Sequence, residues 1–61
     1  PAPVERDATI QMAATLAVNV AGRPERWVEF RDRLHRDTAA DPKSLVLAAI
    51  ALGWSEKWRS N

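Results

Sequence analysis

The chain has 61 residues, of which 46% are hydrophobic and 28% are charged, a balance typical of globular and not of disordered proteins. It contains no cysteine and one histidine, which excludes disulfides, thiolate metal sites and a multi-histidine metal site within one chain. The formal net charge of +1 is too small to indicate nucleic-acid binding by itself.

The short length predicts a single small helical domain over residues 1–61. A chain of this size buries only about 60% of the surface that its unfolded form exposes, so its stability is marginal. Because disulfides and metals are excluded, self-association or docking on another protein remains as the means of stabilisation. No segment approaches the roughly 18–20 apolar residues of a membrane span, and no signal peptide is recognisable. We therefore expect a cytoplasmic protein that contacts no membrane and binds no cofactor.

Residues 8–22 form a stretch without any charged side chain. They predict a helix over about 7–21 that is covered on most sides, because its apolar surface is about twice as wide as in an ordinary amphipathic helix. The two prolines near the N-terminus favour an extended arm over residues 1–6, with Asp7 as the N-cap. Gly22 is placed to end the helix in a left-handed conformation.

Two lines of side chains distinguish the faces of this first helix. Small residues recur at every fourth position and would let a neighbouring helix approach closely: Ala13, Ala17 and Ala21. Its polar line is Gln11, Thr15 and Asn19. That polar line is either a buried stripe across a dimer or the solvated edge of the helix.

The second predicted helix runs over about 24–37, with Pro24 at its first position. Its apolar side carries Trp27, Phe30 and Leu34, and its other positions are mainly charged. The arginines on this helix allow a phosphate-contacting face. However, four acidic residues interleave with them, which favours a solvated, ion-paired surface.

The third predicted helix runs over about 42–53, with Asp41 as N-cap and Pro42 at the first position. Residues 44–55 again carry no charge, and on a helical wheel they have two apolar faces. The first face holds Leu47, Ile50, Trp54 and Trp58. The opposite face holds Leu45, Ala49 and Leu52. One small monomer buries only one of them, so the other needs a partner surface.

Gly53 has two interpretations, and whether it ends this helix or lies within a longer one is left open. The spacing Ala49-x-x-x-Gly53-x-Ser55 resembles the centre of a helix-turn-helix, in which Ser55 would cap a DNA-reading helix. That helix would be very short, and Arg59 occupies a position where an apolar residue is usual. The alternative is a glycine that closes an apolar helix.

No pattern of catalytic residues is present. His35 has Asp32 three residues before it, a geometry compatible with proton transfer, but no nucleophile stands nearby. Phosphate loops and metal-ligand spacings are absent, so we expect no enzyme activity and no metal.

The expected fold is an all-α three-helix bundle with a short C-terminal helical turn or extension, in which consecutive helices are antiparallel. Its predicted core is Ile10, Ala13, Leu16, Ala17, Val20, Trp27, Phe30, Leu34, Leu47, Ile50 and Trp54. Residue usage is typical of proteins from GC-rich bacteria and their phages, which is a property of composition and not a motif.

The expected function is that of a regulatory or adaptor protein that occupies a surface of a protein partner, with a homodimer as the favoured state. The predicted partner-binding residues are Val18, Leu45, Leu52, Trp54 and Trp58. Rim or nucleic-acid contacts are predicted at Arg26, Arg33, Lys57 and Arg59. The alternatives are a dimeric DNA-binding regulator using Ser55–Arg59 and a docking domain excised from a larger enzyme.

Overall fold

The computed structural model describes the backbone of residues 2–37 and 41–60 and the side chains of 6–36 and 41–59. It contains three α-helices and one short 3₁₀ turn. The helices are α1 (Ala2–Ala21), α2 (Trp27–Asp37) and α3 (Pro42–Ser60), and the 3₁₀ turn η1 (Pro24–Arg26) leads directly into α2. The prediction of an all-α chain with three helices is thus confirmed.

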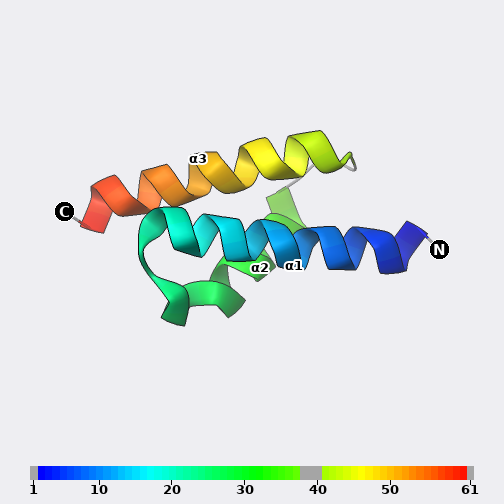
Figure 1. Cartoon of the computed structure of the whole chain (residues 1–61), viewed down its shortest axis with the longest axis horizontal. Coiled ribbons are helices and arrows are strands. Elements are labelled where there is room, and N and C mark those ends of the chain that lie inside the picture. The colour runs from blue at the N-terminus through cyan, green and yellow to red at the C-terminus, as the bar shows by residue number, and fades with distance from the viewer. Residues whose placement is uncertain (1, 38–40, 61) are drawn as a thin grey trace.

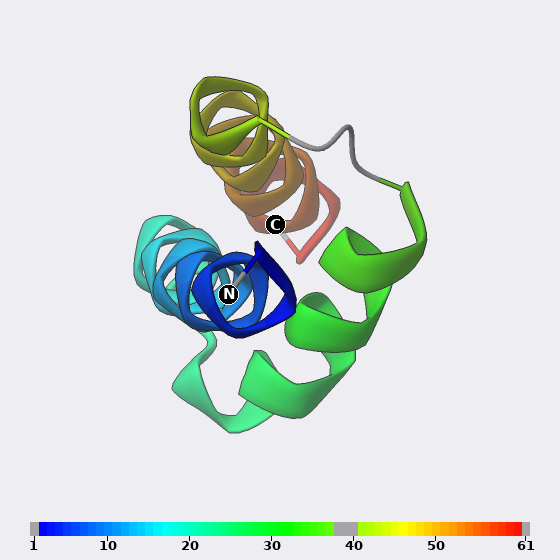
Figure 2. The ribbon, with the colours of Figure 1, turned by 90° about the vertical axis from the view of Figure 1, so that its right-hand side faces the viewer.

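The helices run alternately up, down and up. Figure 1 shows α1 and α3 side by side and running in the same direction, and the end-on view in Figure 2 places the three helices at the corners of a triangle. The molecule measures 40 × 19 × 16 Å, so it is elongated along the helix axes. Residues 38–40, which join α2 to Asp41, lie outside the described residues.

The start of α1 differs from the prediction. The helix begins at Ala2, so the expected extended arm is wrong where the structure describes it, and Asp7 lies inside the helix and not at its N-cap. Pro3 is compatible with this because it falls in the first helical turn, where a backbone N–H has no intrahelical partner.

The end of α1 confirms the role predicted for Gly22. This residue has φ +70°, its N–H donates to the carbonyl of Asn19 at 3.3 Å, and the N–H of Arg23 donates to the carbonyl of Val18 at 2.9 Å. These two bonds form a Schellman motif, which satisfies carbonyls that the last turn leaves without partners. The chain then turns sharply into η1 and α2.

The start of α3 also confirms its prediction. The carboxylate of Asp41 accepts hydrogen bonds from the backbone N–H of Ser44 at 2.9 Å and from its hydroxyl at 2.8 Å. These bonds hold the pKa of Asp41 below its ordinary value, the backbone bond contributing most. Pro42 occupies the first helical position as expected.

Gly53 lies inside α3, which continues to Ser60 and not to about residue 53. A Cβ atom added at Gly53 would stand 2.7 Å from the carbonyl oxygen of Ala17 and 2.7 Å from Cβ of Val20. The glycine is therefore required for the close approach of α3 to α1. This close approach also requires small side chains on α1. The predicted small-residue line is indeed buried, and it consists of Ala13, Ala17 and Ala21.

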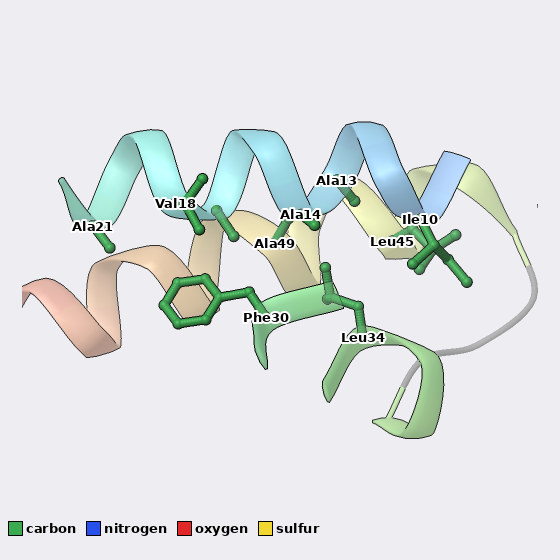
Figure 3. Close-up of a cluster of buried hydrophobic side chains, with 10 residues drawn as sticks. Ile10, Ala13, Ala14, Val18, Ala21, Phe30, Leu34, Leu45 and Ala49 are labelled. Atoms are coloured by element: carbon green, nitrogen blue, oxygen red, sulfur yellow. The ribbon is translucent and has the colours of Figure 1, made fainter. Parts of the chain in front are cut away.

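The core joins one face of each helix (Figure 3). Its buried members are Ile10, Ala13, Ala14, Ala17, Val18, Ala21, Phe30, Leu34, Leu45 and Ala49. Leu16 and Trp27 pack against it while partly buried. Four other residues predicted for the core are not among its buried members. Leu47 is 58% exposed and Trp54 is 46% exposed, whereas Val20 and Ile50 are only partly buried.

Candidate interaction surface

Large apolar side chains remain uncovered along one side of α3. This row, which we call the outer face, consists of Val46, Leu47, Ile50, Trp54 and Trp58. Leu47 is 58% exposed and Trp58 is 69% exposed, whereas Ile50 is half-buried. Scattered apolar residues are normal on protein surfaces, but a contiguous row of this kind marks an interaction site.

The two tryptophans of the outer face are ordered against each other. The rings of Trp54 and Trp58, one helical turn apart, stack with centroids 6.3 Å apart and an interplanar angle of 20°. The ammonium of Lys57 lies 5.2 Å from the centroid of the Trp54 ring, within cation–π range. The outer face therefore ends in a stacked pair of indole rings with the ammonium of Lys57 beside it.

The prediction that α3 has two apolar faces is correct, but the assignment of those faces is wrong. Leu45 and Ala49, expected on the partner side, are buried against α1 and α2, and Leu52 packs partly buried against the same core. Val18, also expected to contact a partner, is buried too. Among the predicted partner-binding residues, only Trp54 and Trp58 lie on the exposed surface as expected.

Side-chain size and one buried acid explain which face of α3 packs against the other helices. Ala49 and Gly53 are the small positions of α3, and they lie on the side that meets the alanine line of α1. Glu56 lies on the same side and is only 3% exposed. The bulky side chains of the outer face, the two tryptophans included, would keep α3 too far from α1 for such a contact.

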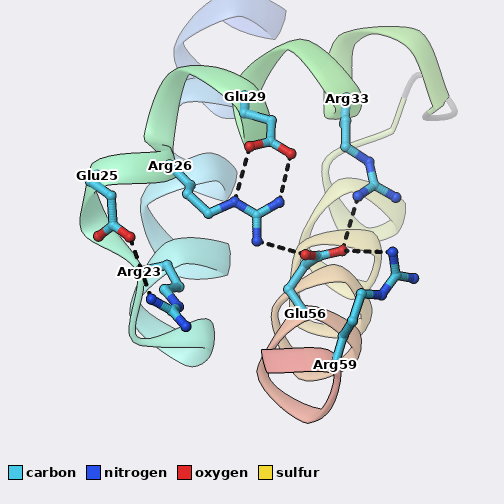
Figure 4. A network of polar contacts seen from close by, with 7 residues as sticks. All are labelled: Arg23, Glu25, Arg26, Glu29, Arg33, Glu56 and Arg59. Carbon is cyan, nitrogen blue, oxygen red and sulfur yellow. Dashed lines mark hydrogen bonds and ion pairs between the residues drawn. The ribbon is translucent and has the colours of Figure 1, made fainter. Parts of the chain in front are cut away.

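Glu56 accepts contacts from three arginines (Figure 4). Its carboxylate lies 2.7 Å from Nη1 of Arg26 and 3.2 Å from Nη1 of Arg33, and Nη1 of Arg59 is 3.9 Å away. Arg26 also binds Glu29 through two parallel bonds of 2.9 and 2.6 Å. The network thus ties the C-terminal half of α3 to η1 and α2.

The charges in this network stabilise one another. The bond from Arg26 lowers the pKa of Glu56, with burial opposing the shift and Arg33 and Arg59 adding to it. The same guanidinium lowers the pKa of Glu29, and the two carboxylates together raise the pKa of Arg26 above its already high value. Glu56, Glu29 and Arg26 are therefore ionised at neutral pH.

The network gives a structural role to the three arginines that the sequence predicts as rim or nucleic-acid contacts. Arg26, Arg33 and Arg59 converge on the same carboxylate, so much of their positive field is neutralised within the chain. Lys57 is the predicted cation that stays beside the outer face. Sequence reasoning missed Glu56, although its place on the Leu45–Ala49–Leu52 side of the helical wheel was a usable signal.

The helix-turn-helix interpretation loses the turn that it requires. Gly53 is helical and lies at the α1–α3 contact, so Ser55 does not cap a separate recognition helix. The alternative interpretation, a glycine that closes the helix, is wrong for the same reason. The segment from Ser55 to Arg59 belongs to the last turns of α3.

The remaining candidate groups have structural partners. The polar line of α1 is solvent-exposed, and Thr15 accepts a hydrogen bond from the indole N–H of Trp27 at 3.0 Å while donating to the carbonyl of Gln11 at 3.0 Å. Nε2 of His35 lies 3.3 Å from the carboxylate of Asp7, a pair between α2 and α1. Among the described residues, each buried side-chain nitrogen or oxygen has a hydrogen-bond partner.

Comparison of the chain with protein-family models, with curated proteins and with solved structures finds no match. In the part of the chain that the structure describes, none of the helices combines the length and hydropathy needed to cross a bilayer.

Proposed function

We propose that this chain is a non-enzymatic protein-interaction module that lays the outer face of α3 against another polypeptide. The observation that carries the proposal is the uncovered row of large apolar side chains, which includes a stacked tryptophan pair. Tryptophan is among the residues most enriched at the energetic centres of protein interfaces.

The distribution of the two apolar faces supports this proposal. Burying a leucine or tryptophan side chain stabilises a protein by about 1.5–3 kcal/mol, and the fold leaves that stabilisation unused on one whole side of α3. The opposite side of the same helix packs on the core, with Leu45 and Ala49 buried and Leu52 partly buried. A regulatory or adaptor role follows from a surface that gains stability only when a partner covers it.

Site-directed photocrosslinking in an extract of the source organism tests the proposal. A photoreactive residue replaces Leu47 on the outer face or, as the matched control, Gln11 on the exposed polar side of α1. We expect a discrete adduct from position 47 only, and we expect it to disappear when Trp58→Ser is added. Equal adducts from both positions, or an adduct unaffected by Trp58→Ser, would contradict the proposal.

A further inference from the structure

The outer face has the spacing and length of a surface that binds one helix. Leu47, Ile50 and Trp54 follow each other at i, i+3 and i+7, the spacing by which a helix presents its anchors to a second helix. From Val46 to Trp58 the row spans about 18 Å at the 1.5 Å rise per residue of an α-helix. A partner segment of about four helical turns would cover it.

The charges at the two ends of this row have the same sign. Lys43 and Lys57 are both exposed, and on a helical wheel both lie within the sector of the outer face. The nearby acids have other partners. Glu56 of α3 is buried with its arginines, and Asp41, which precedes α3, is bound by Ser44. Among the described residues, the outer face is thus an apolar row with a lysine near each end.

This pattern disfavours a second copy of the chain as the occupant. In an antiparallel pair centred on Ile50, Lys43 of each copy faces Lys57 of the other, so that like charges meet at both ends. In a parallel pair, each lysine faces its own equivalent. Like charges placed opposite one another across an apolar helix interface disfavour that pairing, a common means of partner selection.

We infer that the outer face of α3 binds an amphipathic helix of a different protein that places carboxylates opposite Lys43 and Lys57. This inference rests on the proposed function and identifies the chemistry of the partner. The cation–π contact with Trp54 keeps the ammonium of Lys57 at the border of the row, where it meets such a carboxylate. Apolar burial supplies most of the affinity, and the lysines select the partner.

Two helical peptides of about 18 residues test this chemistry. Both carry the same leucine row, and they differ only in having glutamates or lysines at the two flanking points. We expect the acidic peptide to bind the full chain about three- to tenfold tighter in low salt, as two rim ion pairs predict. The preference should shrink in high salt and reverse in the double variant Lys43→Glu/Lys57→Glu.

Self-association gives a second, independent readout. We expect the wild-type chain to sediment as a monomer at micromolar concentration. The single variant Lys43→Glu makes an antiparallel pair self-complementary and should shift the chain toward a dimer, whereas the double variant should not. Because both positions are exposed, we expect neither substitution to change thermal unfolding. An unchanged melting temperature then confirms that each variant is folded.

The possible outcomes distinguish the proposed function from the inference about the partner's charge. Equal binding of the two peptides would overturn the charge inference while supporting the proposed function, and binding of neither peptide would overturn both. A wild-type dimer disrupted by Leu47→Asp would show that a second copy occupies the face. Tighter binding to phosphatidylserine vesicles than to the acidic peptide would identify a lipid surface and would also overturn the inference.

Discussion

α1 and α3 are similar in length and mean hydropathy, but they differ in the side chains that they leave exposed to solvent. Both carry a long stretch without charge. The sequence predicts that the first is covered on most sides and that the second has two opposite apolar faces. The exposed side of α1 carries the polar line that includes Thr15, whereas the exposed side of α3 carries Leu47 and two tryptophans. Two chain segments with similar hydropathy thus differ in what they leave to solvent, and only α3 retains an unused apolar face.

The largest expected effect distinguishes the two sides of α3. We expect Leu45→Ala to lower the free energy of unfolding by about 2–5 kcal/mol, because it removes a fully buried side chain and leaves a cavity. Leu47→Ala makes the same chemical change at an exposed position and should change stability by no more than about 0.5 kcal/mol. Urea unfolding measures both, and a larger effect at Leu47 would reverse the assignment of the two faces.

The contact between α1 and α3 is tested by adding volume where they meet. Gly53→Val should destabilise the chain by about 1–3 kcal/mol or more, because even a Cβ there meets the backbone of Ala17. The matched control is Ala51→Val on the exposed side of α3, where we expect only the small cost of a branched residue in a helix. Thermal unfolding followed by circular dichroism compares them. Equal melting temperatures would show that the helices do not meet at Gly53.

The Glu56 network makes a prediction for pH. Because the arginines lower the pKa of Glu56 in the folded state, the unfolded chain binds its proton more readily. The stabilisation is therefore present above the ordinary pKa of 4.5 and is lost as the pH falls through the lowered folded-state value. We expect Glu56→Gln to cost about 1–3 kcal/mol at neutral pH and to flatten the fall in stability in acid.

Urea unfolding between neutral pH and pH 3 measures this effect. Glu25→Gln is the control, since Glu25 is an exposed acid whose carboxylate lies 3.8 Å from Nη1 of Arg23. We expect that variant to change stability by less than about 0.5 kcal/mol and to keep the acid dependence. Identical pH profiles for Glu56→Gln and the wild-type chain would contradict the role assigned to the network.

The smallest effect concerns the polar side of α1. Thr15→Val removes the hydroxyl that links α1 to the indole of Trp27, and it should cost about 0.5–1 kcal/mol because the bond is exposed to solvent. Thr15→Ser keeps the hydroxyl and should retain the hydrogen bond. The difference between their melting temperatures measures the bond, and Thr15→Val as stable as Thr15→Ser would exclude its contribution.

Local sequence signals determined the ends and the number of the helices. Gly22 and Asp41 occupy the cap positions predicted for them, because a left-handed C-cap and a side-chain N-cap depend only on a few neighbouring residues. The buried alanine line of α1 and the apolar side of α2 were also predictable from helical spacing. One exception is the start of α1, where proline in a first turn fits both an arm and a helix. The other is the end of α3, which continues past Gly53 to Ser60.

Only the tertiary structure decided which face of α3 turns inward. By hydrophobicity alone the face with Leu47 and Trp54 was the better core candidate, and that choice is wrong. Close packing on the alanines of α1 requires the small side, and Glu56 on that side meets arginines from η1 and α2 that are far away in sequence. Side-chain volumes and charge partners on other helices are not encoded in the periodicity of one segment, so the sequence determined that α3 has two faces while the packing determined which of them remains exposed.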